Sequence, residues 1–310
     1  MSEVAQTLSP QPLPAQPIAH VQVWPAWRDY VTLTKPRIMS LLVLTSVCAM
    51  VAAAGGDPAP VHLAALVIGG ALSCGGASAL NHVLDRDIDR LMGPRTASRP
   101  VAAGRITPVR ATVFGLGLLT VAFVILTVFA NLLTAVLAMA GGAFYVLVYT
   151  VWLKRSTPQN IVIGGAAGAI PPLAGWAAAH GQIGLGAVFL FVIVLLWTPP
   201  HFWALSVLLA PGYAAADVPM LPVVSGPAET SRQILVYSFA LLAATLVPAL
   251  VGTFGLLYLG AAVVLGGVLC RLAWQLRRDV RPARAAVLFH YSLLYLALLF
   301  AAVALDSVVR

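Results

Sequence analysis

The chain has 310 residues, of which 60% are hydrophobic and 9% are charged. Soluble domains carry about 25% charged residues, so this composition excludes a single soluble core. The formal net charge of +8 could suit nucleic acid, but the cations lie in short loops between apolar stretches. That distribution favours a polytopic membrane protein that has the lipid bilayer, and no nucleic acid, as its partner.

The first segment, residues 1–28, is rich in Pro and Gln and has no Lys or Arg before Arg28. It also lacks the apolar centre of a signal peptide, and it does not resemble an Arg-rich transit peptide. We expect residues 1–28 to form a disordered cytoplasmic tail and residues 29–310 to form a single domain.

Nine apolar segments follow, each near the ~20 residues that a spanning helix needs. The predicted fold class is therefore an all-α membrane bundle of nine transmembrane helices. The predicted spans are 37–55, 61–84, 109–129, 132–152, 160–179, 184–208, 233–253, 256–275 and 285–305.

The loops between these spans predict the orientation. If the spans alternate in direction, all of the 18 Lys and Arg residues except Arg310 fall on one side of the membrane. Lys and Arg mark the cytoplasmic side, so we expect a cytoplasmic N-terminus and a C-terminus on the opposite face.

An acidic cluster lies at the cytoplasmic end of the second span. Asn81, Asp85 and Asp89 are spaced four residues apart and would share one face of a helix. One amide and two carboxylates form a hard oxygen surface suited to Mg²⁺. Asp87 would project from the opposite side, as a partner of an arginine. The alternative is that the aspartates only pair with Arg86 and Arg90.

Four arginines follow in residues 90–105, and Mg²⁺ next to guanidinium groups is what a diphosphate requires. Lys35 opens the first span on the same side, and Lys154 closes the fourth. These two cations would either contact diphosphate or only snorkel to the interface and set the topology.

The spacing of residues 81–89 resembles the N-x-x-x-D-x-x-x-D motif of the UbiA superfamily of intramembrane prenyltransferases. Within that superfamily the chain is similar to the branch of protohaem IX farnesyltransferases (haem O synthases). Five segments in the branch's order carry the resemblance. They are 33–38, then 81–89 with 98–100 and 103–106, then 149–168, 197–205 and 218–224.

The resemblance implies an enzyme that uses Mg²⁺ to transfer farnesyl from farnesyl diphosphate to the 2-vinyl group of haem b, with water added. It implies a multi-pass protein of a bacterial plasma membrane with its active site facing the cytoplasm. A haem A synthase or a terminal oxidase would receive the product. The implied catalytic residues are Asn81, Asp85, Asp89, Arg99 and Lys154, and the implied substrate-binding residues are Lys35, Arg95, Arg105, His201 and Tyr213.

One departure from the family affects the expected second Mg²⁺ site. The family usually has adjacent aspartates just before the tyrosine of its second cytoplasmic motif, whereas this chain has Pro211 and Gly212 before Tyr213. Asp217 is expected to act as a metal ligand from a shifted position. The alternatives are a weakly held second metal or reduced activity.

His201 follows Pro199 and Pro200, which remove backbone donors from their helix. A histidine near the end of an apolar span is usually a packing residue, but the resemblance gives this one a role in placing haem, by iron ligation or a propionate contact. Aromatic faces can stabilise a cation in the prenyl pocket or serve as core and interfacial residues. The candidates are Trp152, Trp176, Trp197, Phe202 and Trp203.

Three other functions remain open from the sequence. A UbiA-type prenyltransferase acting on 4-hydroxybenzoate or a similar ring would share the aspartate motif. A transporter could use Asp85 and Asp89 as ion-coupling groups, although they lie at the end of a span and no inverted repeat is evident. A haem-binding assembly protein without catalysis would fit the altered second motif.

Overall fold

The structure, a computed structural model, describes residues 26–310. Most of the predicted N-terminal tail therefore lies outside the described residues. Helix α1 (Trp27–Leu33) begins with the last two residues of that segment, Trp27 and Arg28. This helix is held in place by the fully buried side chain of Leu33 and by an ion pair between Asp29 and Arg105.

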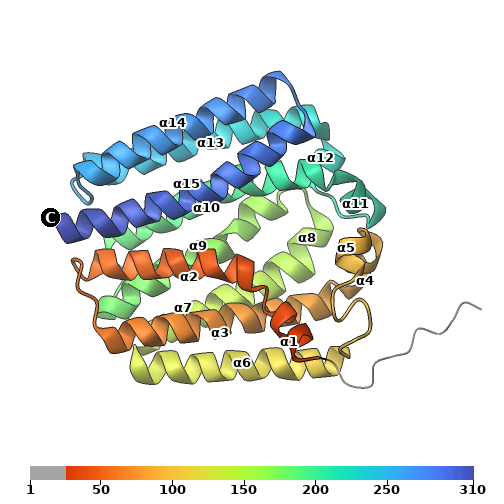
Figure 1. The fold of residues 1–310 in the computed structure, drawn as a ribbon, viewed down its shortest axis with the longest axis horizontal. Helices are drawn as coiled ribbons and strands as arrows, with labels where there is room; N and C mark the ends of the chain where they lie inside the picture. The colour runs from red at the N-terminus through yellow and green to blue at the C-terminus, as the bar shows by residue number, and fades with distance from the viewer. Residues whose placement is uncertain (1–25) are drawn as a thin grey trace, which may run out of the picture.

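The described residues fold into helices joined by short loops (Figure 1). Nine helical segments of this part of the chain are long and apolar enough to cross a membrane, which confirms the predicted number. Eight of them are α2 (Pro36–Ala53), α3 (Pro60–Leu84), α6 (Pro108–Phe129), α9 (Asn160–His180), α10 (Leu185–Leu208), α13 (Gly226–Leu250), α14 (Leu256–Arg278) and α15 (Pro282–Val309). The remaining span combines α7 (Leu132–Ala143), a π-helical segment η1 (Phe144–Leu153) and α8 (Lys154–Ser156).

The largest difference from the predicted spans lies in α13, which begins at Gly226 instead of residue 233. Pro227 stands in the first turn, where its missing N–H costs no hydrogen bond. Glu229 and Arg232 then form an ion pair on this polar turn. Hydropathy marks the part of a helix that lipid can cover, so it missed a helical turn made of polar residues.

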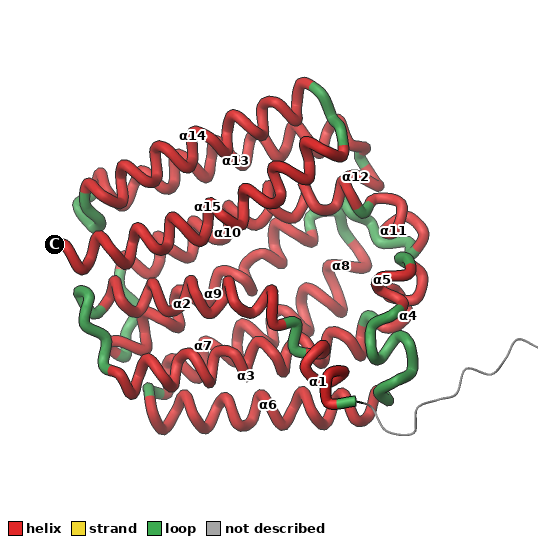
Figure 2. The backbone as a smooth tube through the Cα atoms, viewed as in Figure 1, coloured by secondary structure: helices red, strands yellow, loops and turns green. Residues whose placement is uncertain are grey.

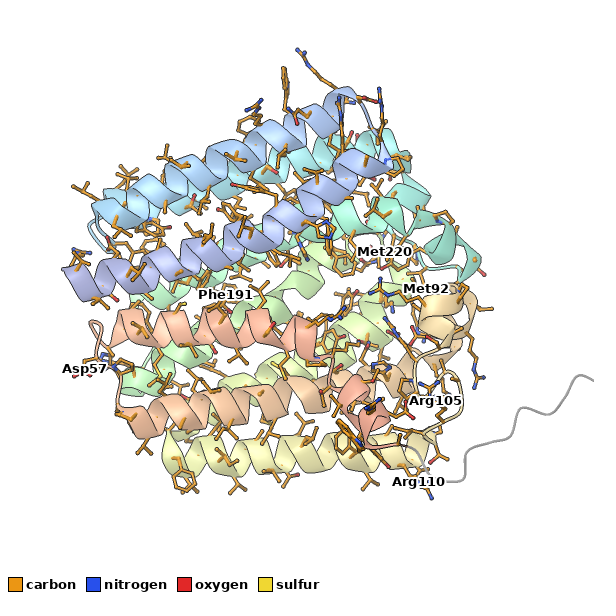
Figure 3. The ribbon with its side chains drawn as sticks, viewed as in Figure 1. Asp57, Met92, Arg105, Arg110, Phe191 and Met220 are labelled. Carbon is orange, nitrogen blue, oxygen red and sulfur yellow. The ribbon has the colours of Figure 1, made fainter. Side chains whose placement is uncertain are left out.

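Five short helices gather at one end of the bundle, at the right of Figure 1. They are α1, α4 (Arg86–Leu91), α5 (Pro94–Ala97), α11 (Ala210–Ala215) and α12 (Leu221–Val224). Figure 2 shows the loops confined to the two ends of the bundle. In Figure 3 Met92, Arg105 and Arg110 lie at the end with the short helices, while Asp57 lies at the other end.

Close backbone contact between α3 and α6 holds the first half of the bundle together. A Cβ added at Gly76 would come within 2.7 Å of the Gly115 carbonyl oxygen, and one added at Gly115 within 3.0 Å of the Gly76 oxygen. Lipid provides no hydrophobic drive for helix association, so small residues that let backbones approach are what such an interface needs.

The π-helical segment is the one irregularity of backbone winding inside a described span. Its wider turn is accompanied by a hydrogen bond from the Thr150 hydroxyl to the Tyr145 carbonyl oxygen, five residues earlier, at 2.9 Å. Single π-helical turns are rare and are frequent at functional sites. Here the segment ends directly before Lys154, at the end of the bundle that carries the aspartates.

Candidate active site

The predicted ligand stripe begins in α3 and continues into α4. Helix α3 ends at Leu84, where the second predicted span also ends, and Asp85 has a non-helical ψ of 4° between the two helices. The backbone ladder nevertheless continues, because the Asp85 N–H donates to the Asn81 carbonyl at 2.9 Å and the Asp89 N–H to the Asp85 carbonyl at 2.8 Å. The three side chains therefore keep their common direction.

This stripe is almost completely buried, with exposed fractions of 2% for Asn81, 2% for Asp85 and 0% for Asp89. Buried carboxylates are unfavourable unless they are paired. The Lys154 ammonium lies 2.6 Å from Asp85 Oδ2, and the Arg99 guanidinium lies 2.5 Å from Asp89 Oδ1. Lys154 is the first residue of α8, directly after η1, and Arg99 lies in the loop after α5, so the site joins three segments of the chain.

Each aspartate has a second oxygen that is buried and has no hydrogen-bond partner among the described residues, namely Asp85 Oδ1 and Asp89 Oδ2. A buried acceptor without a partner is costly, and such atoms in a native fold call for an explanation. A hard cation fits this arrangement, since Mg²⁺ is commonly held by one or two carboxylates together with substrate phosphate and water. Within residues 26–310 no group of three or more His, Cys, Asp or Glu side chains could hold a metal. A cation bound by Asp85 and Asp89 would therefore need further ligands of another kind, such as substrate phosphate and water.

Lys35 reaches the same site from the start of α2. Its backbone lies in the left-handed region at φ 50°, an uncommon conformation for a residue with a side chain. Its ammonium donates to Asn81 Oδ1 at 2.7 Å. Burial, and next the nearby Arg99 charge, lower the pKa of Lys35 to about 7. Burial and a neighbouring positive charge disfavour the charged form of a lysine. A bound anion would favour that charged form again.

The amide of Asn81 is held on both sides. Its Nδ2 donates to Asp85 Oδ2 at 2.8 Å and to the Thr150 hydroxyl at 3.0 Å, while its Oδ1 accepts from Lys35. Asn81 therefore links the aspartates to η1 and α2. Its predicted role as a metal ligand would require Lys35 to release Oδ1.

Burial raises the pKa of Asp89, which opposes the influence of Arg99. Around the two aspartates stand three cations, those of Lys35, Arg99 and Lys154. The site thus carries more positive than negative charge before any ligand binds, which suits an anion such as a diphosphate.

Asp87 lies outside this cluster, as predicted, with 59% of its side chain exposed. The Arg155 guanidinium donates a hydrogen bond to each of its carboxylate oxygens at 2.8 Å, and a further one to the Leu84 carbonyl oxygen. The hydrogen bond from Arg155 keeps the pKa of Asp87 well below its usual range. The alternative in which Arg86 and Arg90 pair with the aspartates does not describe this structure, because Arg155, Arg99 and Lys154 are the partners.

Arg95 and Arg105 do not reach the buried aspartates in this structure. Arg105 bonds Asp29 at 3.0 Å and the Ser98 carbonyl oxygen at 3.0 Å, which ties α1 to the loop before α6. Arg95 is exposed on α5. Their contact with substrate remains a prediction.

The altered second motif forms α11 and the loop behind it. Tyr213 is buried, and burial raises its pKa to about 12, with Arg99, Asp85 and Asp89 close enough to influence it. A Cβ at Gly212 would collide with the Met92 carbonyl oxygen, so α11 packs directly on the end of α4.

Asp217 is exposed and lies at φ 51° in the left-handed region. It lines a hollow together with Asp87 and Arg155, and neither Asp85 nor Asp89 is among the residues that line it. Its role as a metal ligand therefore remains a prediction.

His201 lies in an aromatic stack in the second half of the bundle. Its ring stacks on Trp197 at 4.2 Å and on Phe289 at 4.9 Å between centroids. Its Nδ1 lies 2.7 Å from the Ser292 hydroxyl. Helix α10 continues through Pro199 and Pro200, so these prolines remove hydrogen-bond donors without ending the helix.

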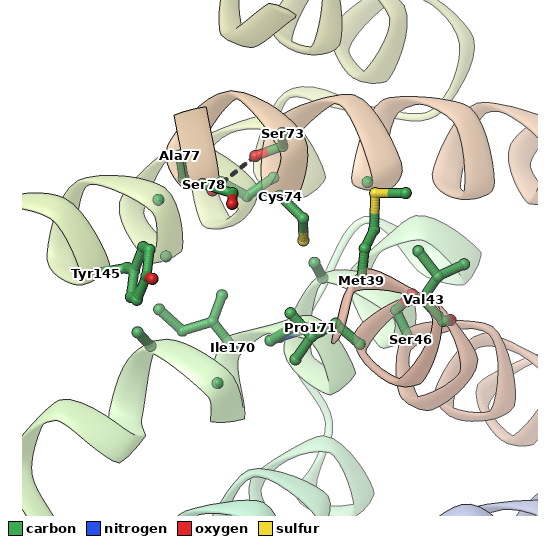
Figure 4. A pocket seen from close by; sticks show the side chains of 18 of the residues that line it. Met39, Val43, Ser46, Ser73, Cys74, Ala77, Ser78, Tyr145, Ile170 and Pro171 are labelled. Carbon is green, nitrogen blue, oxygen red and sulfur yellow. Dashed lines mark hydrogen bonds between the residues drawn. The ribbon is translucent and has the colours of Figure 1, made fainter. Parts of the chain in front are cut away.

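An apolar cavity opens beside the aspartates, between α2, α3, α6, α7 and α9. Its empty volume, including space that is open to solvent, is about 980 Å³. Lys35, Ser78 and Tyr145 line one end, and the remaining wall is mostly carbon (Figure 4). None of the five aromatic residues proposed from the sequence, four tryptophans and Phe202, lines this cavity. The side chain of Trp152 is instead exposed, at 64%.

Two residues of the site carried no role in the sequence-based prediction. Thr150 holds the Asn81 amide, and Tyr145 contributes the aromatic ring at the cavity mouth and stacks on Tyr149 at 5.7 Å. An α-helical register does not reveal this arrangement, because it depends on π-helical winding.

Comparison with known proteins agrees with this architecture. Residues 42–301 match the UbiA prenyltransferase family. A relative from Symbiobacterium thermophilum called protoheme IX farnesyltransferase is 52% identical over 282 residues, covering 90% of this chain and 94% of the relative. A relative of the same name from Gloeobacter violaceus is 49% identical over 286 residues, covering 91% and 93%. In Roseiflexus sp. a relative of that name is 49% identical over 282 residues, and this chain spans about half of it, 53%.

Solved structures show the same fold at low sequence identity. A structure of digeranylgeranylglyceryl phosphate synthase matches with a TM-score of 0.75 at 17% identity, covering 91% of this chain and 99% of that one. A UbiA homologue from Archaeoglobus fulgidus, solved with GPP and Mg²⁺, matches with a TM-score of 0.63 at 15% identity, covering 89% and 99%. The chain therefore belongs to the UbiA prenyltransferase family, in which its similar relatives are protoheme IX farnesyltransferases.

Proposed function

We propose that the chain transfers a farnesyl group from farnesyl diphosphate to the 2-vinyl group of haem b, with addition of water, giving haem O and diphosphate. One observation carries the proposal. Asp85 and Asp89, each with one free buried oxygen, stand among three cations at the mouth of an apolar cavity. The names of the relatives supply the acceptor.

The cations of the site would bind the diphosphate and stabilise the charge that develops as it leaves. Arg99, Lys154 and Lys35 approach from different segments and are fixed by the aspartates and Asn81, so they are arranged before substrate binds. Preorganised charge of this kind acts on the transition state without reorganisation. Asp85 and Asp89 would hold Mg²⁺, which when bound would supply further positive charge to the diphosphate oxygens.

The cavity would hold the prenyl chain and keep water from the allylic carbon. Its wall is almost entirely apolar, and Tyr145 presents an aromatic ring at the mouth, where positive charge would develop. Exclusion of water prevents hydrolysis of a reactive cation.

In the reaction the C1–O bond of farnesyl diphosphate breaks and the terminal carbon of the vinyl group bonds to C1. Water then bonds to the other vinyl carbon and releases one proton. The product carries a hydroxyethylfarnesyl group, and diphosphate takes the electron pair of the broken bond. No external oxidant or reductant is required.

A single-turnover assay tests this function. The full chain in lipid nanodiscs is mixed with farnesyl diphosphate, haem b and Mg²⁺, and the haem product is identified by mass. We expect haem O, and none when the metal is removed by a chelator. In a parallel reaction 4-hydroxybenzoate replaces haem b, and its prenylation, with no haem O formed in the first reaction, would establish the aromatic prenyltransferase. Haem binding without turnover of either acceptor would establish an assembly protein.

His201 is proposed to place the haem. Ser292 engages its Nδ1, which leaves Nε2 for the iron or a propionate. We expect His201→Ala to change the visible spectrum of the haem-loaded protein, while Ser292→Ala changes it less. A His201→Ala spectrum identical to that of the unmodified protein would exclude iron ligation.

Asp217 is proposed to assist a second Mg²⁺ in place of the family's missing aspartates. Its exposed position beside Asp87 allows this only if the loop carrying it moves toward the site. Unchanged turnover and Mg²⁺ dependence in Asp217→Ala would remove it from the metal site.

We place the protein in a bacterial plasma membrane with the active site facing the cytoplasm. The cations at the end of the bundle with the short helices support this orientation. A haem A synthase or a terminal oxidase is the proposed recipient of the product.

A further inference from the structure

The apolar cavity has a defined depth. Its mouth is formed by Lys35 on α2, Ser78 on α3 and Tyr145 on η1, and its deepest lining residues on these three spans are Ser46, Leu66 and Thr134. An α-helix rises about 1.5 Å per residue, so the paths from Lys35 to Ser46 and from Ser78 to Leu66 measure about 16 and about 18 Å. The path from Tyr145 to Thr134 is similar, about 16 Å.

The deep end is closed by packed side chains. Leu126 of α6 is fully buried and lies over Gly69 of α3, and Leu66 is 2% exposed. Leu66 also packs with Met50 and Ala178 in a separate small core. Hydrogen bonds from Asn131 to the Ala177 carbonyl oxygen, and between His180 and the Ala53 carbonyl oxygen, join the helix ends there.

The mouth leads directly to the site that would hold a diphosphate. Lys35 lines the cavity and also donates to Asn81, which in turn bonds Asp85. A prenyl diphosphate anchored at these residues would have its chain directed along the cavity toward Leu66 and Leu126.

Ordinary carbon–carbon bond lengths give an extended isoprene unit a length of about 5 Å. Chains of two, three and four units are then about 10, 15 and 20 Å long. The three-unit chain fits the depth of the cavity, and the four-unit chain exceeds it.

We infer that this cavity is a length gauge that selects a C15 prenyl chain, and that Leu66 and Leu126 are its stop. The inference rests on the proposed function, because it assumes that a prenyl diphosphate binds at Asp85 and Asp89. It assigns to the two leucines a role in specificity that the reaction chemistry does not require.

One variant makes the gauge shorter. Gly70 lines the cavity about 12 Å below Ser78, and no atom lies within 4 Å of the position its Cβ would take. Gly70→Leu therefore adds bulk to the cavity without a backbone clash. We expect the ratio of kcat/KM for farnesyl over geranyl diphosphate to fall about tenfold or more.

The matched control is Gly260→Leu. Gly260 is also a helical glycine with open space around its Cβ position, but it is exposed on α14 and does not line the cavity. This control should keep the original preference for chain length.

A second variant makes the gauge longer. Leu66→Ala combined with Leu126→Ala removes six carbons from the stop, more than the five carbons of one isoprene unit. We expect kcat/KM for geranylgeranyl diphosphate to rise about tenfold relative to that for farnesyl diphosphate. The control, Leu241→Ala with Leu299→Ala, removes two fully buried leucines that do not line the cavity.

Two results would overturn the gauge while leaving the proposed function intact. They are equal use of C15 and C20 diphosphates by the unmodified protein, and an unchanged preference in Gly70→Leu. Failure to transfer any chain would instead reject the proposed function. In that case the gauge is tested by the thermal stabilisation of the protein on binding S-thiolodiphosphate analogues of the three chain lengths. A gauge requires that the C15 analogue stabilises the unmodified protein most and that the C10 analogue stabilises Gly70→Leu most.

Discussion

Asp85, Asp87 and Asp89 occur within five residues, yet the structure gives them different surroundings. Asp85 and Asp89 are buried, and each has one oxygen paired with a cation and one free. Asp87 is exposed and fully engaged by Arg155. Burial and a free oxygen, more than the negative charge itself, distinguish a carboxylate that can bind a ligand from one that stabilises a surface turn.

We expect Asp85→Asn and Asp89→Asn each to reduce farnesyl transfer by about 10²-fold or more, the scale seen when one preorganised group is removed from an active site. Asparagine keeps the size of the side chain but supplies a single neutral acceptor. The measurement is haem O formed per protein under single-turnover conditions, with size-exclusion chromatography to verify folding.

The matched control is Asp87→Asn, which alters the same short segment at its exposed position. It should retain transfer within a few fold, because Arg155 still finds the Leu84 carbonyl oxygen. Equal losses in all three variants would show that the segment matters for folding and would contradict the assignment of Asp85 and Asp89 to the site.

At this scale the sequence predicted the residues better than their partners. The four-residue spacing identified Asn81, Asp85 and Asp89 because the backbone ladder keeps its register across the break at Asp85. It could not show that Arg105 pairs with Asp29, which is 76 residues away. Pairings of that range depend on how whole helices pack.

At the scale of the element, the π-helical winding of η1 sets the positions of two side chains of the site, Thr150 and Tyr145. Thr150 accepts a hydrogen bond from Asn81 and donates one to the Tyr145 carbonyl oxygen. We expect Thr150→Val, which keeps the shape and removes the hydroxyl, to lower kcat/KM for farnesyl diphosphate roughly tenfold, the value of a hydrogen bond of about 1–1.5 kcal/mol.

Thr150→Ser should restore most of the activity, because it restores the hydroxyl. Thr120→Val is the control, since the Thr120 hydroxyl bonds only its own helix on an exposed face of α6. A Thr150→Val protein with unchanged kinetics would exclude η1 from positioning Asn81.

Helix α11 provides a second prediction for an element. Gly212 packs against the Met92 carbonyl oxygen, while Pro211 is exposed. Gly212→Asp should therefore destabilise the protein by about 1–3 kcal/mol through overpacking. Pro211→Asp, its neighbour, should leave the midpoint of thermal unfolding nearly unchanged. If both variants unfold at the original temperature, the close contact between α11 and α4 does not exist.

Hydropathy located every span of the described chain but not the irregularities that shape the site. It sums over about 20 residues, so it is insensitive to π-helical winding, to a break such as the one at Asp85, and to polar turns such as the start of α13. These local features depend on contacts with other helices, and a single apolar segment contains no information about them.

At the scale of the whole molecule, an odd number of spans and the distribution of charge together predict the topology. Because the described residues contain nine spans, an odd number, the chain should enter the first span and leave the last on opposite sides of the membrane. The loops with nearly all of the cations belong to the end that carries α4, α5 and α11, and that end should face the cytoplasm.

Fusions test this topology in a bacterial host. Alkaline phosphatase, which is active only outside the cytoplasm, should be active when joined after Arg310 and inactive when joined after Arg155. Green fluorescent protein should give the opposite pattern, because it fluoresces when folded inside. A fluorescent fusion after Arg310 would mean that the chain crosses the membrane an even number of times.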